Sequence, residues 1–345
     1  MYSYIIYNSI LFFSFLFSFI AEYGKGGKNF LRILVFITLW LPAAIRYEVG
    51  VDYNSYVEIY EGIRPNLINE LGFLYIQNVL QWIECSVQWL FVMTSFIMYV
   101  PLCLALKQQN YCSIISFYVL FVYFSSLGFI RQFLAVSCLV YSLYNYLYTY
   151  DNKKCYWGMI LSLMFHYSAL CYLIVFFLFR DFRIGIKRML VIIVLFYGLI
   201  ISIDFVPFLF KSVAIFIPSY GAYIDSIFNA PTPLGTGLGV LSRLLIPFCV
   251  LLNADKLINK NNRNSLLVIL NLIYILVNIL AVNIFVFVRL NELFLFVLPF
   301  SFAELLKIRF KYKKIVMSLI CILSIILFEK NILLHFIYPY QCLWD

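Results

Sequence analysis

The sequence predicts an all-α fold, a polytopic transmembrane helical bundle of about 11–12 membrane helices. Three observations carry this prediction. Of the 345 residues, 64% are hydrophobic and only 12% are charged, whereas a soluble domain has about a quarter of its residues charged. Apolar runs that approach the roughly 20 residues of a membrane-crossing helix recur along the whole chain. The short alternating segments that are typical of a transmembrane β-barrel do not occur in the sequence.

Basic residues in the loops between these runs set the predicted orientation. Because cytoplasmic loops are rich in Lys and Arg, Lys25 and Lys28 after the first span place the amino terminus outside. The same rule places the carboxyl terminus outside and leaves two outer segments, 46–84 and 204–238. We expect a single integral membrane domain, 1–345, with continuous spans at about 4–21, 31–45, 86–106, 112–128, 130–149, 189–203, 240–253, 265–284, 287–305 and 314–328.

Residues 156–179 do not fit one continuous span, because basic residues such as Lys154 and Arg180 lie on both flanks. We predict a pair of short helices that enter and leave on the cytoplasmic side and break near His166. A broken helix is tolerated in the membrane only where protein or a water-filled cavity receives the freed backbone groups. Such breaks often mark binding sites.

Composition and motifs restrict the class of function. The net charge of +9 is explained mostly by basic cytoplasmic loops and does not point to a nucleic-acid partner. No glycine-rich phosphate loop or nucleotide-binding domain interrupts the chain. Two histidines are too few for a His-based metal site. We expect no metal ion and no cofactor, and an enzyme of this kind would use an activated substrate carried on a lipid.

Four arginines are predicted within about a turn of the outer end of a hydrophobic span. An arginine in this position is costly unless it has a partner or reaches the interface. Its planar guanidinium suits bidentate binding of phosphate. The alternatives are interfacial anchors or ion pairs, such as Arg289 with Glu292 one turn on. Convergence on one face favours a site for a lipid-linked pyrophosphate, made by Arg46, Arg131, Arg243 and Arg289.

The outer segment that begins at Arg46 carries the densest set of reactive groups. Asp52 opens a helical stretch in which Tyr53, Tyr56 and Tyr60 share one face. Aromatic faces stack on sugar rings, and a carboxylate can act as a general base toward a hydroxyl nucleophile. The alternative is an Asp helix cap on an interfacial helix whose tyrosines lie at headgroup level.

Four positions stand out in the rest of the chain. Arg131 and Gln132 begin the predicted span 130–149, and His166 lies at the predicted helix break. An isolated His in an apolar stretch is either a hydrogen-bonded structural residue or a functional one, and its place at a break raises the second possibility. Tyr340 near the carboxyl terminus lies near the outer surface, where it either covers a cavity or belongs to the aromatic belt.

Together these motifs resemble the EpsG family, which is related in role to the Wzy O-antigen polymerases. The resemblance covers nearly the whole chain, and its first three motifs are fairly specific in combination. They are Arg46-(x)3-Gly50-x-Asp52-(x)3-Tyr56, Ile130-Arg131-Gln132-(x)2-Ala135 and Phe165-His166-Tyr167-Ser168-Ala169, with Arg289 and the closing Pro339-Tyr340 as weaker matches.

This resemblance implies a bacterial inner-membrane glycosyltransferase. Such enzymes join oligosaccharide repeat units carried on undecaprenyl pyrophosphate into O-antigen, capsule or exopolysaccharide at the outer face of the membrane. The implied partners are the undecaprenyl-pyrophosphate-linked glycan, the lipid bilayer, a chain-length regulator and a flippase. Arg131, Arg243 and Arg289 would bind the pyrophosphate, and Asp52 or His166 would be the base. The remaining substrate-binding residues would be Arg46, Tyr56, Gln132 and Tyr340.

Three other functions share part of this pattern. A flippase for lipid-linked oligosaccharides would bind the same anion without chemistry, but it would need cationic residues through the bilayer centre and an internal repeat. A membrane acyltransferase would place its catalytic His and Asp near the cytoplasmic side. A ligase that joins finished polysaccharide to a lipid core shares nearly all of these features.

Overall fold

The computed structural model describes residues 2–66, 68–105, 110–202, 237–283, 286–333 and 337–342. Within these ranges the chain is almost entirely helical, with only two strands of two residues each. The all-α prediction is therefore confirmed. Most of the predicted outer segment 204–238, including its Gly/Pro-rich stretch, lies outside the described residues.

The chain forms two compact units, Met1–Val175 with Ser324–Asp345, and Phe176–Leu323. The expectation of one integral membrane domain stays a prediction. The helices of the first unit are α1 (Tyr2–Tyr23), α2 (Lys28–Ile45), α3 (Tyr53–Tyr60), α4 (Leu71–Trp82), α5 (Val87–Ala105), α6 (Tyr111–Phe121), α7 (Tyr123–Gly128), α8 (Ile130–Tyr144) and α9 (Asn152–Phe165).

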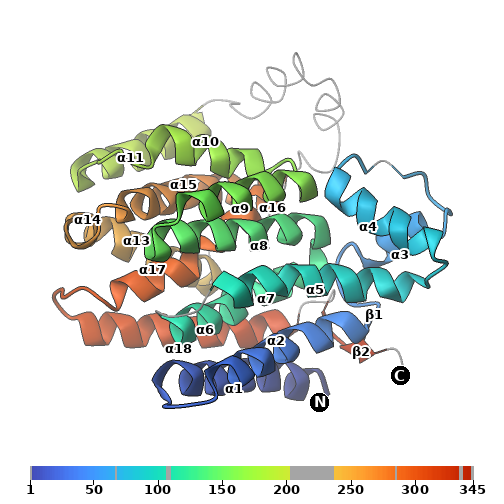
Figure 1. Cartoon of the computed structure of the whole chain (residues 1–345). Coiled ribbons are helices and arrows are strands. Elements are labelled where there is room, and N and C mark those ends of the chain that lie inside the picture. Colours follow the sequence, from blue (N-terminus) through green and yellow to red (C-terminus); the bar gives the residue numbers. More distant parts are fainter. Residues whose placement is uncertain are drawn as a thin grey trace. The chain divides into compact units, whose positions relative to one another are not determined.

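Long helices make the body of the first unit (Figure 1). α8 packs on α9 and α5, while α2 packs on α1 and α5, and α1 packs on α6. The short helices α3 and α4 lie at one end of this body (Figure 1). They belong to the predicted outer segment 46–84, in which the sequence predicted a helix opened by Asp52 but not α4.

The two ends of the first unit's chain are joined at the same end of the bundle. Strand β1 (Arg46–Tyr47) pairs antiparallel with β2 (Gln341–Cys342), so that Arg46 lies opposite Cys342. The Ser3 hydroxyl accepts a hydrogen bond from the Tyr340 amide at 2.9 Å. That both termini lie outside the membrane stays a prediction.

The predicted helix break near His166 is confirmed. α9 ends at Phe165, and α10 (Ala169–Phe179) begins three residues after His166, which has an extended backbone. The break lies against the segment that leads into α4, because α4 packs on α9. The first helix of the predicted pair therefore reaches the outer segment 46–84.

The second unit is built around α15 (Asn264–Asn283), which contacts most of the other helices of the unit. The predicted span 287–305 is two helices, α16 and α17, because the chain breaks between Phe294 and Val297. The other helices of this unit are α11 (Ile186–Ser202), α13 (Leu238–Leu252), α14 (Ala254–Lys260), α16 (Val286–Phe294), α17 (Val297–Leu305) and the first part of α18 (Lys313–Ile332).

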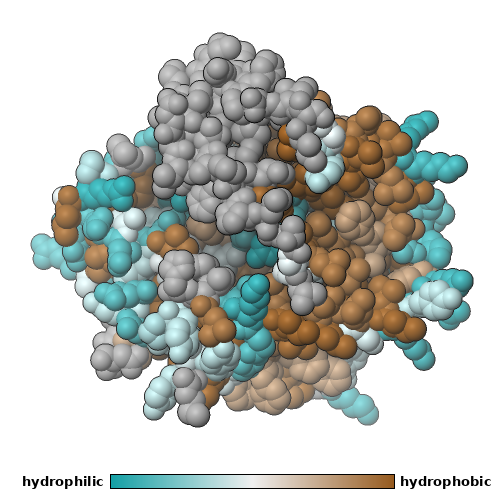
Figure 2. Space-filling view, turned by 180° about the vertical axis from the view of Figure 1, so that it is seen from behind, coloured by the Kyte–Doolittle hydropathy of each residue, from teal (hydrophilic) through white to brown (hydrophobic). Residues whose placement is uncertain are grey.

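The helices have the composition of membrane spans. Four described helices are long and apolar enough to cross a bilayer, namely α1, α2, α15 and α18, and shorter apolar helices accompany them. Large apolar side chains that would be buried in a soluble protein are exposed, such as Phe12 and Phe15 on α1 and Val194 on α11. The face in Figure 2 carries a broad field of hydrophobic side chains with hydrophilic ones at its margins. Lipid is the solvent that accepts such a surface.

Candidate functional site

The loop between α2 and α3 begins the site, and Gly50 fixes its path. Gly50 has φ +122°, a conformation that side-chain-bearing residues rarely adopt, and a Cβ there would collide with the Leu127 carbonyl. The loop therefore lies directly on the end of α7. This close approach places Asp52 at the start of α3 and turns the buried Tyr56 toward α8.

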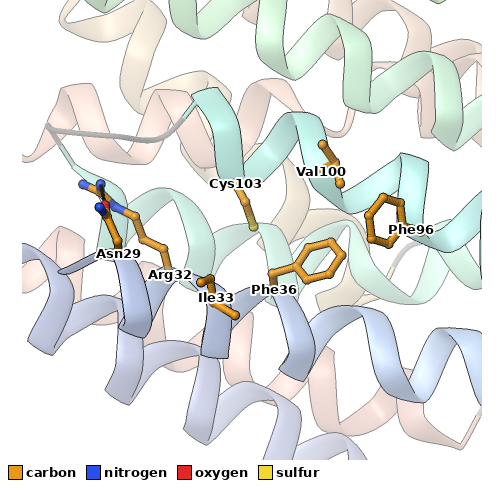
Figure 3. A pocket seen from close by; sticks show the side chains of 7 residues that line it. All are labelled: Asn29, Arg32, Ile33, Phe36, Phe96, Val100 and Cys103. Carbon is orange, nitrogen blue, oxygen red and sulfur yellow. Dashed lines mark hydrogen bonds between the residues drawn. The ribbon is translucent and has the colours of Figure 1, made fainter. Parts of the chain in front are cut away.

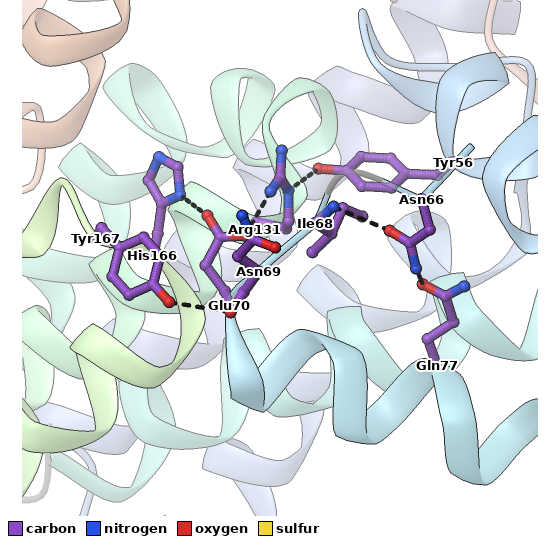
Figure 4. A network of polar contacts seen from close by, with 9 residues as sticks. All are labelled: Tyr56, Asn66, Ile68, Asn69, Glu70, Gln77, Arg131, His166 and Tyr167. Atoms are coloured by element: carbon purple, nitrogen blue, oxygen red, sulfur yellow. Dashed lines mark hydrogen bonds and ion pairs between the residues drawn. The ribbon is translucent and has the colours of Figure 1, made fainter. Parts of the chain in front are cut away.

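Glu70, the residue before α4, is the centre of the polar cluster (Figure 4). One carboxylate oxygen, Oε2, accepts a hydrogen bond from Arg131 Nη1 at 2.6 Å. The other, Oε1, lies 2.8 Å from His166 Nδ1. The Glu70 side chain is 6% exposed, while the side chains of Arg131 and His166 are each 25% exposed. The carboxylate thus lies beneath a cation and an imidazole that both reach the surface.

Arg131 is held from a second direction by α3. Its Nε donates to the Tyr56 hydroxyl at 3.2 Å, and the Tyr56 ring packs on Phe73 at 5.3 Å between centroids. Burial raises the pKa of Tyr56, so this phenol stays neutral at physiological pH. Within the described part of the chain, Arg131 Nη2 makes no hydrogen bond, and Figure 4 shows it pointing away from the Glu70 carboxylate.

Close contacts hold the segment around Glu70 against the helix break. A Cβ at Gly72 would lie 2.9 Å from the Met164 carbonyl and 3.0 Å from the Phe165 ring, so only glycine permits this approach without displacement. The Tyr167 hydroxyl donates to the Asn69 carbonyl at 3.0 Å. These contacts fix the register between residues 69–72 and 164–167, and they set the distance between Glu70 and His166.

The cluster keeps Glu70 ionised. Burial alone would raise the pKa of this carboxyl, but the hydrogen bond with His166 and the charge of Arg131 outweigh it and lower the pKa to about 2. An ionised carboxylate only accepts hydrogen bonds. His166 Nδ1 therefore carries the proton in the contact with Glu70.

Arg46 and Tyr340 come together, but below the surface. Arg46 is 2% exposed, and its guanidinium lies 5.3 Å from the centre of the Phe91 ring. The Tyr340 hydroxyl donates to the Pro42 carbonyl at 2.8 Å, and the ring is 7% exposed. Arg46 begins β1, and Tyr340 directly precedes β2.

The two remaining predicted residues of this unit lie next to the cluster. Asp52 occupies the N-cap position of α3, but its side chain makes no capping hydrogen bond. Burial first, and then the charge of Asp52, raise the pKa of Tyr56. Gln132 is 4% exposed within α8.

In the second unit, Arg243 on α13 and Glu292 on α16 form an ion pair, with Nη1 and Oε1 3.4 Å apart. The alternative pair that the sequence suggested for Glu292 was Arg289, whose side chain is exposed. Because Arg243 and Arg289 belong to the second unit, their convergence with Arg131 on one pyrophosphate stays a prediction.

A separate cavity of about 280 Å³ lies between α2 and α5 (Figure 3). Its lining is mostly apolar and includes no carboxylate or histidine: Asn29, Arg32, Ile33, Phe36, Phe96, Val100 and Cys103. The cavity shares no residue with the Glu70 cluster.

A family model described as the EpsG family matches residues 29–342, nearly the whole chain. The chain belongs to the EpsG family. EpsG-like proteins are Wzy-type polymerases, so membership makes this chain a polysaccharide-polymerase-like membrane protein and confirms the resemblance. No curated protein and no solved structure matches it.

In this EpsG-family chain, sequence reasoning missed Glu70, the residue that connects Arg131 to His166. The sequence feature that could have indicated Glu70 is an acidic residue followed by Leu71 and Gly72, directly before an apolar run. Glu is not a preferred helix cap, so an acid in that position has another use. Tyr167 was given no role, although its hydroxyl ties the helix break to Asn69.

The described residues contain no group of three or more His, Cys, Asp or Glu side chains placed to hold a metal ion. The polar groups of the Glu70 cluster are one carboxylate, one guanidinium, one imidazole and one phenol. A guanidinium can stabilise a leaving phosphate, and an imidazole can accept a proton. The cluster therefore has the two groups that sugar transfer from a diphosphate requires.

Proposed function

We propose that the protein polymerises undecaprenyl-pyrophosphate-linked oligosaccharide repeat units into O-antigen, capsule or exopolysaccharide at the outer face of the bacterial inner membrane. The observation that carries this proposal is the joining of Arg131 and His166 through one carboxylate at the end of the first helical unit. Family membership supplies the class of reaction.

The chemistry is displacement at an anomeric carbon. The hydroxyl of one lipid-linked repeat unit loses its proton to a base and attacks the anomeric carbon of the growing chain. The bond to undecaprenyl pyrophosphate breaks, and the pyrophosphate leaves with the electron pair. A base and a fixed cation are the protein groups that this reaction requires, by analogy with inverting sugar transfer.

Each predicted residue has a role in this proposal. Arg131 binds the pyrophosphate, and Asp52 or His166 is the base. Tyr56 holds Arg131, and its helix offers aromatic side chains to the sugar. That Arg243 and Arg289 also bind the anionic donor stays a prediction, and Gln132, the residue after Arg131 on α8, is a further predicted substrate-binding residue. The buried Arg46 and Tyr340 maintain the β1–β2 junction that closes this end of the unit.

The partners and orientation follow from the same reaction. The donor and acceptor both arrive on lipid, after a flippase has moved them outward, and a chain-length regulator limits the product. Both termini then lie outside the inner membrane, on the side of α3 and α4.

A clean deletion in the native host tests this proposal. Analysis of the surface polysaccharide should show a single repeat unit attached where the wild type carries a long chain, and plasmid-borne wild type should restore the long chain. Loss of all repeat units from the surface would instead indicate a flippase or a ligase, and an unchanged polysaccharide would reject all three functions.

A further inference from the structure

We propose that His166 is the base of the polymerase reaction and that Glu70 is its positioning residue. This inference rests on the proposed function and names the residue that prepares the base. The sequence left the choice between Asp52 and His166 open, and the contacts of the Glu70 cluster decide it.

Glu70 determines which nitrogen of the His166 ring carries the proton. Glu70 Oε1 lies 2.8 Å from His166 Nδ1, and the ionised carboxylate requires a proton on that nitrogen. In the neutral ring the lone pair is then on Nε2. Figure 4 shows Nε2 on the side of the ring opposite to Glu70, and within the described residues it makes no hydrogen bond. Nε2, the nitrogen that can accept a proton, is therefore the one without a hydrogen bond among the described residues.

Glu70 and the neighbouring backbone contacts hold the His166 ring in place. A base must be held within hydrogen-bonding reach of the proton that it removes. His166 is at a helix break, where a side chain would otherwise have wide freedom. Glu70 fixes the ring directly, and the Tyr167–Asn69 hydrogen bond and the close approach of Gly72 to Met164 fix the backbone on both sides.

Glu70 also connects His166 to the guanidinium of Arg131. The carboxylate that orients His166 also binds Arg131 Nη1 at 2.6 Å. One residue therefore sets the spacing between the base and the group that faces the leaving pyrophosphate. The acceptor hydroxyl gives its proton to Nε2 as its oxygen bonds to the anomeric carbon, and the bond from that carbon to the pyrophosphate oxygen breaks. His166 then returns the proton to solvent.

Asp52 is at the N-terminus of α3, and its charge acts on Tyr56, whose hydroxyl is already engaged with Arg131. Asp52 therefore acts on the Arg131 side of the cluster, and the position of a base is occupied by His166.

Kinetics of the purified full-length protein test this inference. The substrate is an organic extract of the deletion strain, which contains the host's own lipid-linked repeat units. Glu70→Gln keeps the size of the side chain but removes its charge, and we expect kcat to fall about 100-fold with KM changed less than about threefold. Glu70→Asp should recover part of that loss. Glu61→Gln is the matched control, because Glu61 is an exposed acid on the same outer segment.

Chemical rescue separates a base from a structural residue. His166→Ala should lower kcat at least about 100-fold, and added imidazole should restore part of the activity when Glu70 is present. The Asp52→Asn protein should retain more activity than His166→Ala. A Glu70→Gln protein with wild-type kcat, a His166→Ala protein that imidazole does not rescue, or an Asp52→Asn protein less active than His166→Ala would each overturn the inference.

These results are distinguishable from failure of the proposed function. If the wild-type protein does not elongate the extracted repeat units, the polymerase proposal itself is rejected. If the wild type elongates them and His166→Ala does so equally well, only the assignment of the base is rejected. The His166→Ala rescue also decides the question should Glu70→Gln not fold.

Discussion

Glu70 accepts a hydrogen bond from Arg131 at 2.6 Å across 61 positions of sequence. The same carboxylate contacts His166, 96 positions away. Three segments that are far apart in the chain, namely the lead into α4, the start of α8 and the α9–α10 break, therefore meet at one buried acid.

The first prediction concerns the energy of this contact. Glu70→Ala leaves Arg131 without its carboxylate partner, and hydrogen bonds to charged groups contribute about 1.5–3 kcal/mol. We expect the free energy of unfolding of the detergent-solubilised protein to fall by about 2 kcal/mol. In a double-mutant cycle with Arg131→Ala, the two losses should not add. Strict additivity would show that the two side chains do not interact.

The second prediction concerns pH. The pKa of Glu70 is lowered from its ordinary value of 4.5 to about 2 in the folded protein. A lowered pKa stabilises the fold above pH 4.5, and this contribution is lost as the pH falls from 4.5 toward 2. Thermal unfolding between pH 7 and pH 3 should show this loss in the wild type, and it should be smaller in Glu70→Gln. Identical pH profiles of the two proteins would argue against an ionised Glu70.

The third prediction concerns Gly72. Gly72→Ala places a methyl group 2.9 Å from the Met164 carbonyl, so α4 must move away from α9. We expect lower thermal stability and reduced polymer length in cells, because the distance between Glu70 and His166 increases. Gly26→Ala is the control, since a Cβ at Gly26 meets no atom within 4 Å. Equal behaviour of the two variants would show that the close approach is not required.

The fourth prediction concerns the identity of the cation. Arg131 uses Nε for Tyr56 and Nη1 for Glu70, which leaves Nη2 for a phosphate oxygen. A lysine has a single nitrogen and cannot make these contacts together. We expect Arg131→Lys to raise KM about tenfold, whereas Arg64→Lys, at an exposed arginine of the same outer segment, should not. Normal polymerisation by Arg131→Lys would count against phosphate recognition at this position.

Most of the fold followed from the sequence because lipid imposes simple rules on composition. The apolar runs located the long helices, and charges on both flanks of 156–179 located the break at His166. The sequence did not reveal the interruptions after Phe121 in the span 112–128 or after Phe294 in the span 287–305. These interruptions lie among buried apolar residues, so the hydropathy does not change there.

The site was predictable only in part. A polar side chain in apolar surroundings costs free energy unless it has a partner or a function. For this reason the sequence singled out Arg131, His166 and Tyr56. Glu70 lies in a polar loop, where an acid is ordinary, and its importance comes from contacts across 61 and 96 positions. Arg46 was predicted near the outer surface, but the pairing of β1 with β2 covers that end of α2. A pairing between distant segments leaves no local pattern in a sequence.

The proposed function requires the Glu70 cluster to face outward, toward the lipid-linked glycans that we propose as substrates. Cysteine labelling with a membrane-impermeant maleimide in intact cells tests this directly, in a variant whose nine native cysteines are replaced by alanine. Tyr75→Cys on α4 replaces a side chain that is 72% exposed, and Tyr150→Cys beyond α8 replaces one that is 57% exposed. We expect labelling of Tyr75→Cys in intact cells and of Tyr150→Cys only after lysis. The reverse pattern would place the Glu70 cluster in the cytoplasm and contradict polymerisation at the outer face.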